Sequence, residues 1–362
     1  MDGSLRSAKL RTRKSTLRCL MANVHCFTSA SYSYLDRVRV LGETLKQFHP
    51  DWKFWLCLSD TEPEGFRLDL ENESIDGVVH VSELGIPELK GWMFEHDVIE
   101  LCTAVKGPML CKLLEQGADK VVYLDPDIAL FSELDYVVEL LDSYDSILTP
   151  HQVKPDTERR AIVDNEIGSL KYGIYNLGFC AVANTDEGRR FARWWRDRLL
   201  DFCFDDVPNG LFTDQRWCDH APVFFPTLHI LRDPGYNVAS WNQSQRPLEI
   251  HSNGEITADG VPLRFFHFTK ITWVGELMLE RYAGASFAVF ELIKWYKWRL
   301  ASHAVHGVPK GWWGYSTYSD GSEIPRAHRV LYRSRPDLKA RFRDPFEIGG
   351  DSFKNYVIEQ AL

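Results

Sequence analysis

Two aspartates separated by one residue, Asp125 and Asp127, follow a short apolar run that is rich in Val and Tyr. A run of this length and composition predicts a buried strand that ends at the first aspartate. In open α/β sheets ligands bind beyond the carboxyl ends of the strands, where this pair would lie. Two carboxylates there suit Mg²⁺ or Mn²⁺ held against a diphosphate. The alternative is an acidic turn without a ligand, because Asp-x-Asp triplets also arise by chance.

A histidine and a lysine near the end of a second apolar run could complete this chemistry. The run 264–268 predicts a late strand that carries His267, and Lys270 follows three residues further on. A histidine can serve as a third metal ligand, and a lysine can neutralise a diphosphate. The alternative is a core histidine beside a surface lysine.

The elements that must position these residues alternate between strand and helix over the first 127 residues. Apolar runs predict strands at 20–27, 54–58, 78–81 and 121–125, and helices at 35–48, 92–106 and 108–117. Because a strand, a helix and a second strand in sequence usually form a parallel crossover, we expect an α/β fold. Its sheet should be mixed but mostly parallel, with helices on its faces.

The second half of the chain is less regular. We expect helices at 133–142, 186–200, from 214 onward and at 276–300, and strands at 146–149, 175–182, 222–226, 229–231 and 264–268. The polar segment 151–174 predicts a loop or lid over a site. Residues 301–362 are polar and aromatic with weak periodicity, so we expect a helical or irregular C-terminal extension.

Composition restricts the class of protein. The chain has 362 residues, of which 44% are hydrophobic and 26% charged, which predicts a globular protein with a proper core. Its net charge of -9 argues against a nucleic-acid binder, which would present a basic surface. We expect no membrane-spanning helix and no secretory signal, because no apolar run is long enough and the N-terminus lacks an apolar region. The eight cysteines include no Cys-x-x-Cys pair, so we expect reduced thiols and a cytoplasmic location.

Five segments, in this order along the chain, resemble the motifs of metal-dependent GT-A glycosyltransferases. The resemblance is to family-8-type enzymes and related bacterial polysaccharide glycosyltransferases, and it spans residues 20 to about 275. The segments are Val122–Asp127, Tyr175–Phe179, Asp214-Gln215, Tyr236-Asn237 and His267–Lys270. The resemblance implies a GT-A, Rossmann-like fold.

The resemblance also implies roles for the charged residues of these segments. Asp125, Asp127 and His267 would bind Mn²⁺ or Mg²⁺, which bridges the diphosphate of a nucleotide sugar. Lys270 would contact that diphosphate, although it stands where the family usually has Gly. The departure from the family pattern leaves open which lysine makes this contact.

Further residues fall on the donor side of the implied site. Asp214 and Gln215 would line the donor sugar and the reaction centre, and Asn176 would bind sugar hydroxyls. Asp214 might otherwise be the N-cap of a helix. The remaining candidates are Thr28 and Tyr34 for the nucleoside, Asp60 for ribose or base, and Thr103 and Lys106 for the donor phosphate or sugar. A solvated lysine at a helix end is the alternative for Lys106.

The implied activity is transfer of a sugar from a nucleotide-diphosphate sugar to a hydroxyl group, with retention of configuration. The acceptor would be a growing glycan of a cell-surface polysaccharide or a lipid-linked glycan. An inverting transferase with Asp214 as base, a sugar nucleotidyltransferase and a non-catalytic glycan-binding module remain as alternatives. The nucleotidyltransferase is disfavoured because residues 28–34 contain neither glycine nor positive charge.

The chain divides into three predicted regions. They are a basic flexible leader at 1–18, a glycosyltransferase domain at 19–275 with a nucleotide-binding half 19–130 and an acceptor half 131–275, and a C-terminal extension at 276–362. The leader could instead be attracted to an anionic membrane surface. The aromatic and basic residues at 295–299 and 312–315 predict packing on the core or on a partner chain, or peripheral contact with the inner face of a membrane. The sequence leaves the oligomeric state open.

Overall fold

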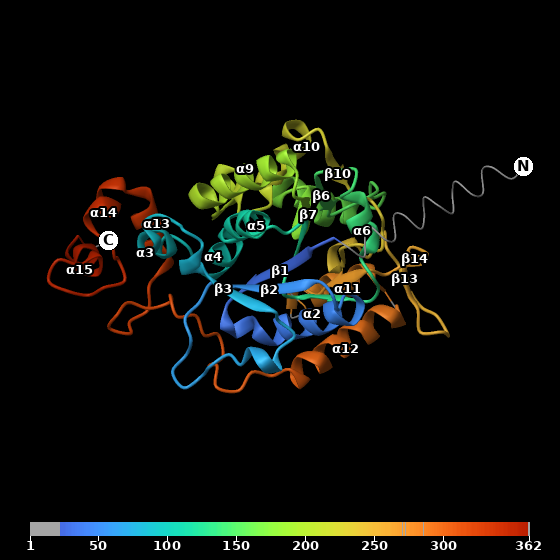
Figure 1. Cartoon of the computed structure of the whole chain (residues 1–362), viewed down its shortest axis with the longest axis horizontal. Helices are drawn as coiled ribbons and strands as arrows, with labels where there is room; N and C mark the ends of the chain where they lie inside the picture. Colours follow the sequence, from blue (N-terminus) through green and yellow to red (C-terminus); the bar gives the residue numbers. More distant parts are fainter. Residues whose placement is uncertain (1–21, 270, 272, 285, 361–362) are drawn as a thin grey trace, which may run out of the picture.

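The computed structural model describes residues 22–269, 271, 273–284 and 286–360. A seven-stranded sheet in the order β10-β6-β7-β4-β1-β2-β3 forms its centre (Figure 1). The strands are β1 (Val24–Ala30), β2 (Lys53–Leu58), β3 (Gly77–His80), β4 (Lys120–Leu124), β6 (Ser146–Pro150), β7 (Tyr175–Ala183) and β10 (Leu228–Ile230). Only β7 runs antiparallel to its neighbours, β4 and β6, within this sheet. The predicted α/β class with a mostly parallel sheet is therefore confirmed.

Helices cover both faces of this sheet (Figure 1). The helices α4 (Val98–Ala104), α5 (Lys106–Glu115) and α9 (Asp186–Phe202) pack on one face, and α2 (Leu35–Phe48) and α6 (Asp135–Leu140) pack on the other. Burial on both faces explains why every residue of β4 is buried and why the residues after Lys120 form one apolar run. Val121 and Tyr123 enter the first cluster, whereas Val122 and Leu124 enter the second.

A small second sheet connects the end of β4 to the late part of the chain. It consists of β11 (Val238–Ala239), β15 (Phe265–His267) and β5 (Ile128–Leu130). The strand β5 starts immediately after Asp127 and pairs antiparallel with β15, so that Ile128 lies opposite His267. This pairing brings His267 next to Asp127. Two further small sheets contain β12 (Leu248–Ile250), β13 (Ile256–Ala258) and β14 (Val261–Pro262), and β8 (Asp205–Asp206) and β9 (Leu211–Phe212).

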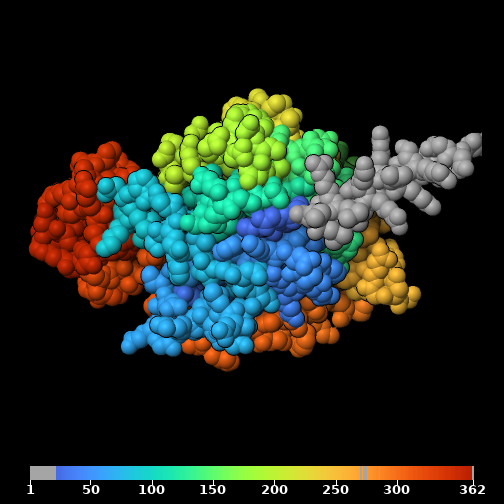
Figure 2. All heavy atoms as spheres, viewed as in Figure 1, coloured from blue at the N-terminus to red at the C-terminus, as the bar shows by residue number. Residues whose placement is uncertain are grey.

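The C-terminal part of the chain builds a separate hydrophobic cluster. Figure 2 shows it as a lobe at one end of the molecule, beside the segment that contains α3 (Leu89–Phe94). The helices of the lobe are α13 (Arg326–Ser334), α14 (Pro336–Arg341) and α15 (Phe353–Glu359). Phe94 inserts into this cluster and packs edge-on against Tyr332 and Phe353. The tail with weak periodicity therefore has its own core.

Several predicted elements are wrong in detail. The helix expected at 276–300 is two helices, α11 (Trp273–Tyr282) and α12 (Phe287–Ser302), and Gly284 between them has a left-handed φ of 57°. The helix expected at 92–106 is interrupted before Asp97, which caps α4. The strand expected at 222–226 is the helix α10 (Ala221–Phe224), because Pro222 occupies its first turn.

The remaining differences concern loops and termini. The segment 151–174, expected as a loop, carries α7 (Arg159–Ala161), a π-helix (Ile162–Ile167) and α8 (Gly168–Tyr172). After residue 214 the chain forms a 3₁₀-helix (Arg216–His220). The predicted leader at 1–18 lies outside the described residues. In the part of the chain that the structure describes, the seven cysteines are free and no helix is both long and apolar enough to cross a membrane.

Candidate active site

Three side chains of the predicted metal site lie together at the carboxyl end of β4. Asp125 and Asp127 follow this strand, and His267 ends β15. The Nε2 atom of His267 lies 3.0 Å from Oδ1 of Asp127 and 3.5 Å from Oδ2 of Asp125. One potential ligand atom from each of the three residues lies within 4.8 Å of the others.

This spacing fits one divalent ion. Ligands at adjacent corners of an octahedron around Mg²⁺ lie about 3.0 Å apart, since each is about 2.1 Å from the ion. Two carboxylate oxygens and one imidazole nitrogen form a donor set that Mg²⁺ and Mn²⁺ accept. The residues present therefore suit the ion that the sequence predicted at this position.

His267 is held in the orientation that a metal ligand needs. Its Nδ1 atom lies 3.3 Å from the side-chain oxygen of Asn237, which can only accept, so Nδ1 can donate there while Nε2 faces the two aspartates and would offer its lone pair to a bound ion. Asn237 in turn donates to Asn176 at 3.0 Å and to Thr149 at 2.9 Å. Asn237 adopts a left-handed φ of 54°, a conformation that asparagine tolerates better than most residues.

The close approach of His267 also requires a glycine. A Cβ atom on Gly178 would lie 2.4 Å from Cε1 of His267, which is closer than any real contact. The carbonyl oxygen of Gly178 accepts a hydrogen bond from the backbone N–H of Asp125 at 2.8 Å. The Asn-x-Gly segment at the start of β7 therefore supports two members of the triad at once.

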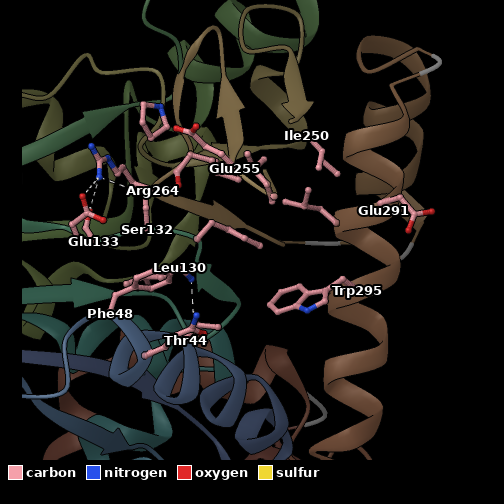
Figure 3. A pocket seen from close by; sticks show the side chains of 17 residues that line it. Thr44, Phe48, Leu130, Ser132, Glu133, Ile250, Glu255, Arg264, Glu291 and Trp295 are labelled. Atoms are coloured by element: carbon pink, nitrogen blue, oxygen red, sulfur yellow. Dashed lines mark hydrogen bonds and ion pairs between the residues drawn. The ribbon is translucent and has the colours of Figure 1, made fainter. Parts of the chain in front are cut away.

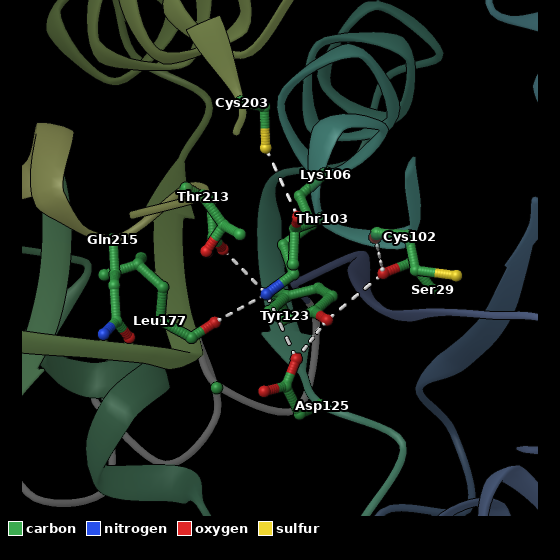
Figure 4. Close-up of polar contacts among 12 residues, drawn as sticks. Ser29, Cys102, Thr103, Lys106, Tyr123, Asp125, Leu177, Cys203, Thr213 and Gln215 are labelled. Carbon is green, nitrogen blue, oxygen red and sulfur yellow. Dashed lines mark hydrogen bonds and ion pairs between the residues drawn. The ribbon is translucent and has the colours of Figure 1, made fainter. Parts of the chain in front are cut away.

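A buried lysine links Asp125 to Asp214, and Figure 4 shows its amine beside Asp125. Nζ of Lys106 lies 3.1 Å from Oδ1 of Asp125 and 2.8 Å from Oδ2 of Asp214, and it donates to the carbonyl of Leu177 at 3.1 Å. Burial disfavours the charge, but the two carboxylates hold the pKa of Lys106 well above its ordinary value. Burial raises the pKa of Asp214, and Lys106 opposes this shift. Lys106 is therefore a cation enclosed by two acids.

Tyr123 holds Asp125 from another direction. Its hydroxyl donates to Oδ1 of Asp125 and lies 3.2 Å from the hydroxyl of Ser29, while its ring lies under Nζ of Lys106 at 4.4 Å (Figure 4). The sequence predicted no role for the side chains of Tyr123 and Ser29. The contact of Tyr123 with Asp125 could have been predicted, because the two are two residues apart and side chains at this spacing on a strand point to the same face.

The other predicted site residues have varied surroundings. Asn176 is 8% exposed, and its amide oxygen accepts from Asn237 and from the N–H of Gly178. Gln215 donates to the carbonyl of Tyr172 at 2.8 Å. The hydroxyl of Thr103 bonds to its own helix and lies 3.3 Å from Sγ of Cys203, so it points toward Cys203 rather than toward the triad (Figure 4).

The nucleoside candidates lie at the ends of β1 and β2. Thr28 is fully buried, and its hydroxyl has no partner among the described residues. Tyr34 is 43% exposed at the start of α2. The carboxylate of Asp60 accepts from three backbone N–H groups, those of Tyr32, Thr61 and Gly314. Lys270 lies outside the described residues.

A separate hollow lies at the opposite end of the β5–β15 pair. It has a volume of about 630 Å³ and is bounded by α2, β5, the β12–β14 sheet and α12. Figure 3 shows Trp295 projecting into it from α12, across from Leu130 and Thr44. No triad residue lines this hollow, so it is distinct from the candidate active site.

No family model matches the chain. Two Bacillus subtilis proteins, both described as uncharacterized, are similar to it. YfnF is 25% identical over 262 residues, which cover 71% of this chain and 85% of YfnF. YfnD is 23% identical over 260 residues, which cover 71% of this chain and 80% of YfnD.

Among solved structures, similar chains include two glycosyltransferases. The galactosyltransferase LgtC, in complex with donor and acceptor sugar analogs, is 14% identical with a TM-score of 0.44, and the match covers 80% of this chain and 98% of LgtC. Mouse xyloside xylosyltransferase 1 is 13% identical with a TM-score of 0.39, and the match covers 69% of this chain and 99% of that enzyme. Because TM-scores below 0.5 do not establish a shared fold, the function has to be inferred from the site residues.

Proposed function

We propose that the chain is a metal-dependent GT-A glycosyltransferase that moves a sugar from a nucleotide-diphosphate sugar to a hydroxyl group of a glycan. The observation that carries this proposal is the triad of Asp125, Asp127 and His267, whose ligand atoms lie within 4.8 Å of one another. The triad stands at the carboxyl end of a mostly parallel sheet, where α/β proteins bind nucleotides.

The chain's own residues prepare this site. A divalent ion bound there would stabilise the negative charge of the departing diphosphate as a Lewis acid. Lys106 and Tyr123 fix one oxygen of Asp125, and Asn237 fixes the ring of His267. Groups held in place before the reaction need no reorganisation when charge develops.

Retention of configuration belongs to the same proposal. An inverting transferase would need a carboxylate base on the face opposite the leaving group. Asp214, the residue named for that role, is 3% exposed and paired with Lys106 at 2.8 Å. Its burial leaves Asp214 little access to an acceptor hydroxyl, and Lys106 stabilises its ionised form, which favours retention.

The finer features of the proposal rest on the sequence patterns. The acceptor would be a growing cell-surface polysaccharide or a lipid-linked glycan, and the location would be cytoplasmic with peripheral membrane contact. The donor would be contacted by Gln215, Asn176, Thr28, Tyr34, Asp60, Thr103 and Lys270. Lys106 supports the site through Asp125 and Asp214, and this pairing competes with a direct contact to phosphate.

A direct test incubates the full chain with a panel of nucleotide sugars, a panel of glycan acceptors and Mn²⁺ or Mg²⁺, and identifies products by mass spectrometry. We expect transfer, or slow hydrolysis of one nucleotide sugar, that EDTA abolishes and Mn²⁺ restores. The variant D127N should lose at least about 100-fold in turnover, because it removes a charged metal ligand.

The control for this variant is D51N, which changes an exposed turn residue after α2. It should retain wild-type turnover. Undiminished turnover in D127N would rule out the metal site, and a wild-type chain that consumes no nucleotide sugar with any acceptor would count against the transferase.

A further inference from the structure

An arginine that no motif singles out lies beside the metal triad. The helix α2 and the strand β5 both start at the carboxyl edge of the sheet, directly after β1 and after the Asp-x-Asp turn. They meet where the N–H of Leu130 donates to the hydroxyl of Thr44 at 3.2 Å. Arg37 precedes Thr44 by seven residues, which is about 10 Å along a helix. Asp127 precedes Leu130 by three residues, which is also about 10 Å along a strand. Measured from the contact between Thr44 and Leu130, Arg37 and Asp127 therefore lie at the same height along the two elements.

The packing of the two elements agrees with this placement. Because α2 packs along β5, the first turn of α2 lies beside the Asp-x-Asp turn that precedes β5. Arg37 belongs to this first turn.

The guanidinium of Arg37 retains most of its hydrogen-bonding capacity. It donates to its chain neighbour Asp36 at 3.0 Å and stacks over the ring of Tyr34 at 4.3 Å. Among the described residues it has no other hydrogen-bond partner. Its side chain is 24% exposed, so a ligand at the sheet edge can reach it. A guanidinium with free N–H groups is the side chain best suited to bind phosphate oxygens in a bidentate way.

A buried tyrosine faces the same place from α12. Tyr296 is 0% exposed, and its hydroxyl has no partner among the described residues. Its ring stacks at 3.9 Å on Phe268, whose N–H donates to the carbonyl of Asp127 at 2.8 Å. Burial raises the pKa of Tyr296 well above its ordinary value, so the hydroxyl remains a donor. A buried hydroxyl without a partner costs free energy unless a ligand satisfies it.

The charges of the site leave a bound diphosphate without a positively charged partner other than the ion. Asp125, Asp127 and Asp214 carry three negative charges, and Lys106 with one divalent ion carries three positive ones. The site with its ion is then neutral, and the negative charge of a diphosphate has no compensation within it. Lys106 is enclosed by two carboxylates, whereas Arg37 faces the single carboxylate of Asp36 and keeps N–H groups that can reach a diphosphate.

We propose that the Arg37 guanidinium and the Tyr296 hydroxyl bind the phosphate oxygens of the donor's diphosphate next to the ion held by Asp127. This inference rests on the proposed function, since it assigns the donor contacts of the same site. Arg37 would neutralise charge on the leaving group, and Tyr296 would donate one hydrogen bond to it.

The test measures binding of inorganic pyrophosphate by titration calorimetry in the presence of Mn²⁺, with the full chain. The variant R37Q should bind about tenfold more weakly or worse, because it loses a charge-assisted bidentate contact. The variant Y296F should bind about fivefold more weakly, because it loses one hydrogen bond. Thermal unfolding of each variant checks that the fold is retained.

The matched control is R335Q. Arg335 also pairs with a nearby aspartate, Asp337, but it lies at the start of α14 in the C-terminal lobe. Its substitution should leave pyrophosphate binding unchanged. Wild-type affinity in R37Q would overturn the proposal for Arg37, and wild-type affinity in Y296F would overturn it for Tyr296.

Turnover separates this inference from the proposed function. If the wild-type chain transfers sugar and R37Q matches it in donor KM and in pyrophosphate affinity, the inference fails and the transferase stands. If the wild-type chain binds Mn²⁺-pyrophosphate through Arg37 but consumes no nucleotide sugar, the transferase fails and the anion site stands.

Discussion

At the residue scale, the geometry of Asp125 depends on partners that themselves touch no ion. Tyr123 donates to one oxygen of Asp125, and Lys106 contacts the same oxygen at 3.1 Å. The other oxygen, Oδ2, is the one that lies 3.5 Å from Nε2 of His267. Tyr123 and Lys106 therefore leave one oxygen of Asp125 directed toward the position of the ion.

Substitution of Tyr123 by Phe tests this dependence. The variant Y123F removes the hydroxyl that fixes Asp125 and leaves the ring under Lys106 in place. Loss of a partner that orients a metal ligand typically weakens metal binding by about 10- to 100-fold, and we expect a loss in this range for Mn²⁺. Titration calorimetry with Mn²⁺ measures it.

The control is Y136F, since Tyr136 is 45% exposed on α6 and lies away from the triad. It should bind Mn²⁺ like the wild type. Equal affinity in Y123F and Y136F would show that Tyr123 does not orient the ligand.

The residues of the triad were accessible from the sequence, but their supports were not. Asp125 and Asp127 follow an apolar run, and His267 ends another, so pattern and resemblance both single them out. Asn237, which fixes the ring of His267, belongs to a segment quoted for the resemblance and suited to bind hydroxyl groups, but the sequence did not predict its contact with His267. Its contact with His267 depends on β11 and β15 lying side by side, and no local pattern encodes that pairing.

At the element scale, buried strands were predictable from apolar runs, but the pairing of short strands was not. The residues of β4 after Lys120 are continuous and apolar because the strand is buried along its whole length. The apolar run 264–268 predicted β15, whereas β5, with three residues, is too short for any periodic signal. Their antiparallel register is fixed by packing, and it is this register that places His267 beside Asp127.

The helix pair α5 and α9 offers a test at this scale. Gly107, the second residue of α5, allows α9 to approach so closely that a Cβ atom there would lie 2.5 Å from Cα of Arg196. The variant G107A should force the helices apart and lower the free energy of unfolding by about 1–3 kcal/mol. It should also displace Lys106 and thereby weaken Mn²⁺ binding. Chemical denaturation measures the first effect, and calorimetry measures the second.

The matched control is another helical glycine. Gly168 begins α8, and a Cβ atom there would meet nothing within 4 Å. G168A should be neutral or stabilising by up to about 1 kcal/mol, because alanine favours the helix. If G107A were as stable as G168A, close packing of α5 on α9 would not constrain residue 107.

At the scale of the whole molecule, the C-terminal segment is fastened to the sheet rather than appended to it. Arg329 is 3% exposed and donates to the carbonyls of Phe94, His96 and Tyr315. Trp313 is 7% exposed and donates to the carbonyl of Ser59 at the end of β2. The sequence left packing and membrane contact open for residues 312–315, and the burial of Trp313 agrees with packing.

Asp60 is the central contact of this attachment. Its carboxylate accepts a hydrogen bond from the N–H of Gly314, 254 positions later in the chain, at 2.6 Å. It also accepts from the N–H groups of Tyr32 and Thr61. Burial raises the pKa of Asp60 to about 6, although these three hydrogen bonds oppose the shift. The folded state therefore retains a proton at a pH where the unfolded chain has lost it.

The sign of the resulting pH dependence follows from proton binding. Between the unfolded pKa of about 3.9 and the folded pKa of about 6, the folded state binds more protons, so stability falls as pH rises. The shift of about two units corresponds to a loss on the order of 2–3 kcal/mol in the free energy of unfolding across this window. Above about pH 6 this contribution should no longer change.

Comparison with D60N isolates this contribution, because other titrating groups, such as the buried His96, are common to both proteins. The unfolding free energy of the wild type minus that of D60N should fall by about 2–3 kcal/mol from pH 4 to pH 6, and then stay constant. Urea unfolding at each pH measures the difference. The variant E64Q, which changes an exposed acid in the neighbouring loop, should follow the wild type at every pH. If the difference in unfolding free energy between the wild type and D60N stayed constant from pH 4 to pH 8, burial would not destabilise the ionised carboxylate of Asp60.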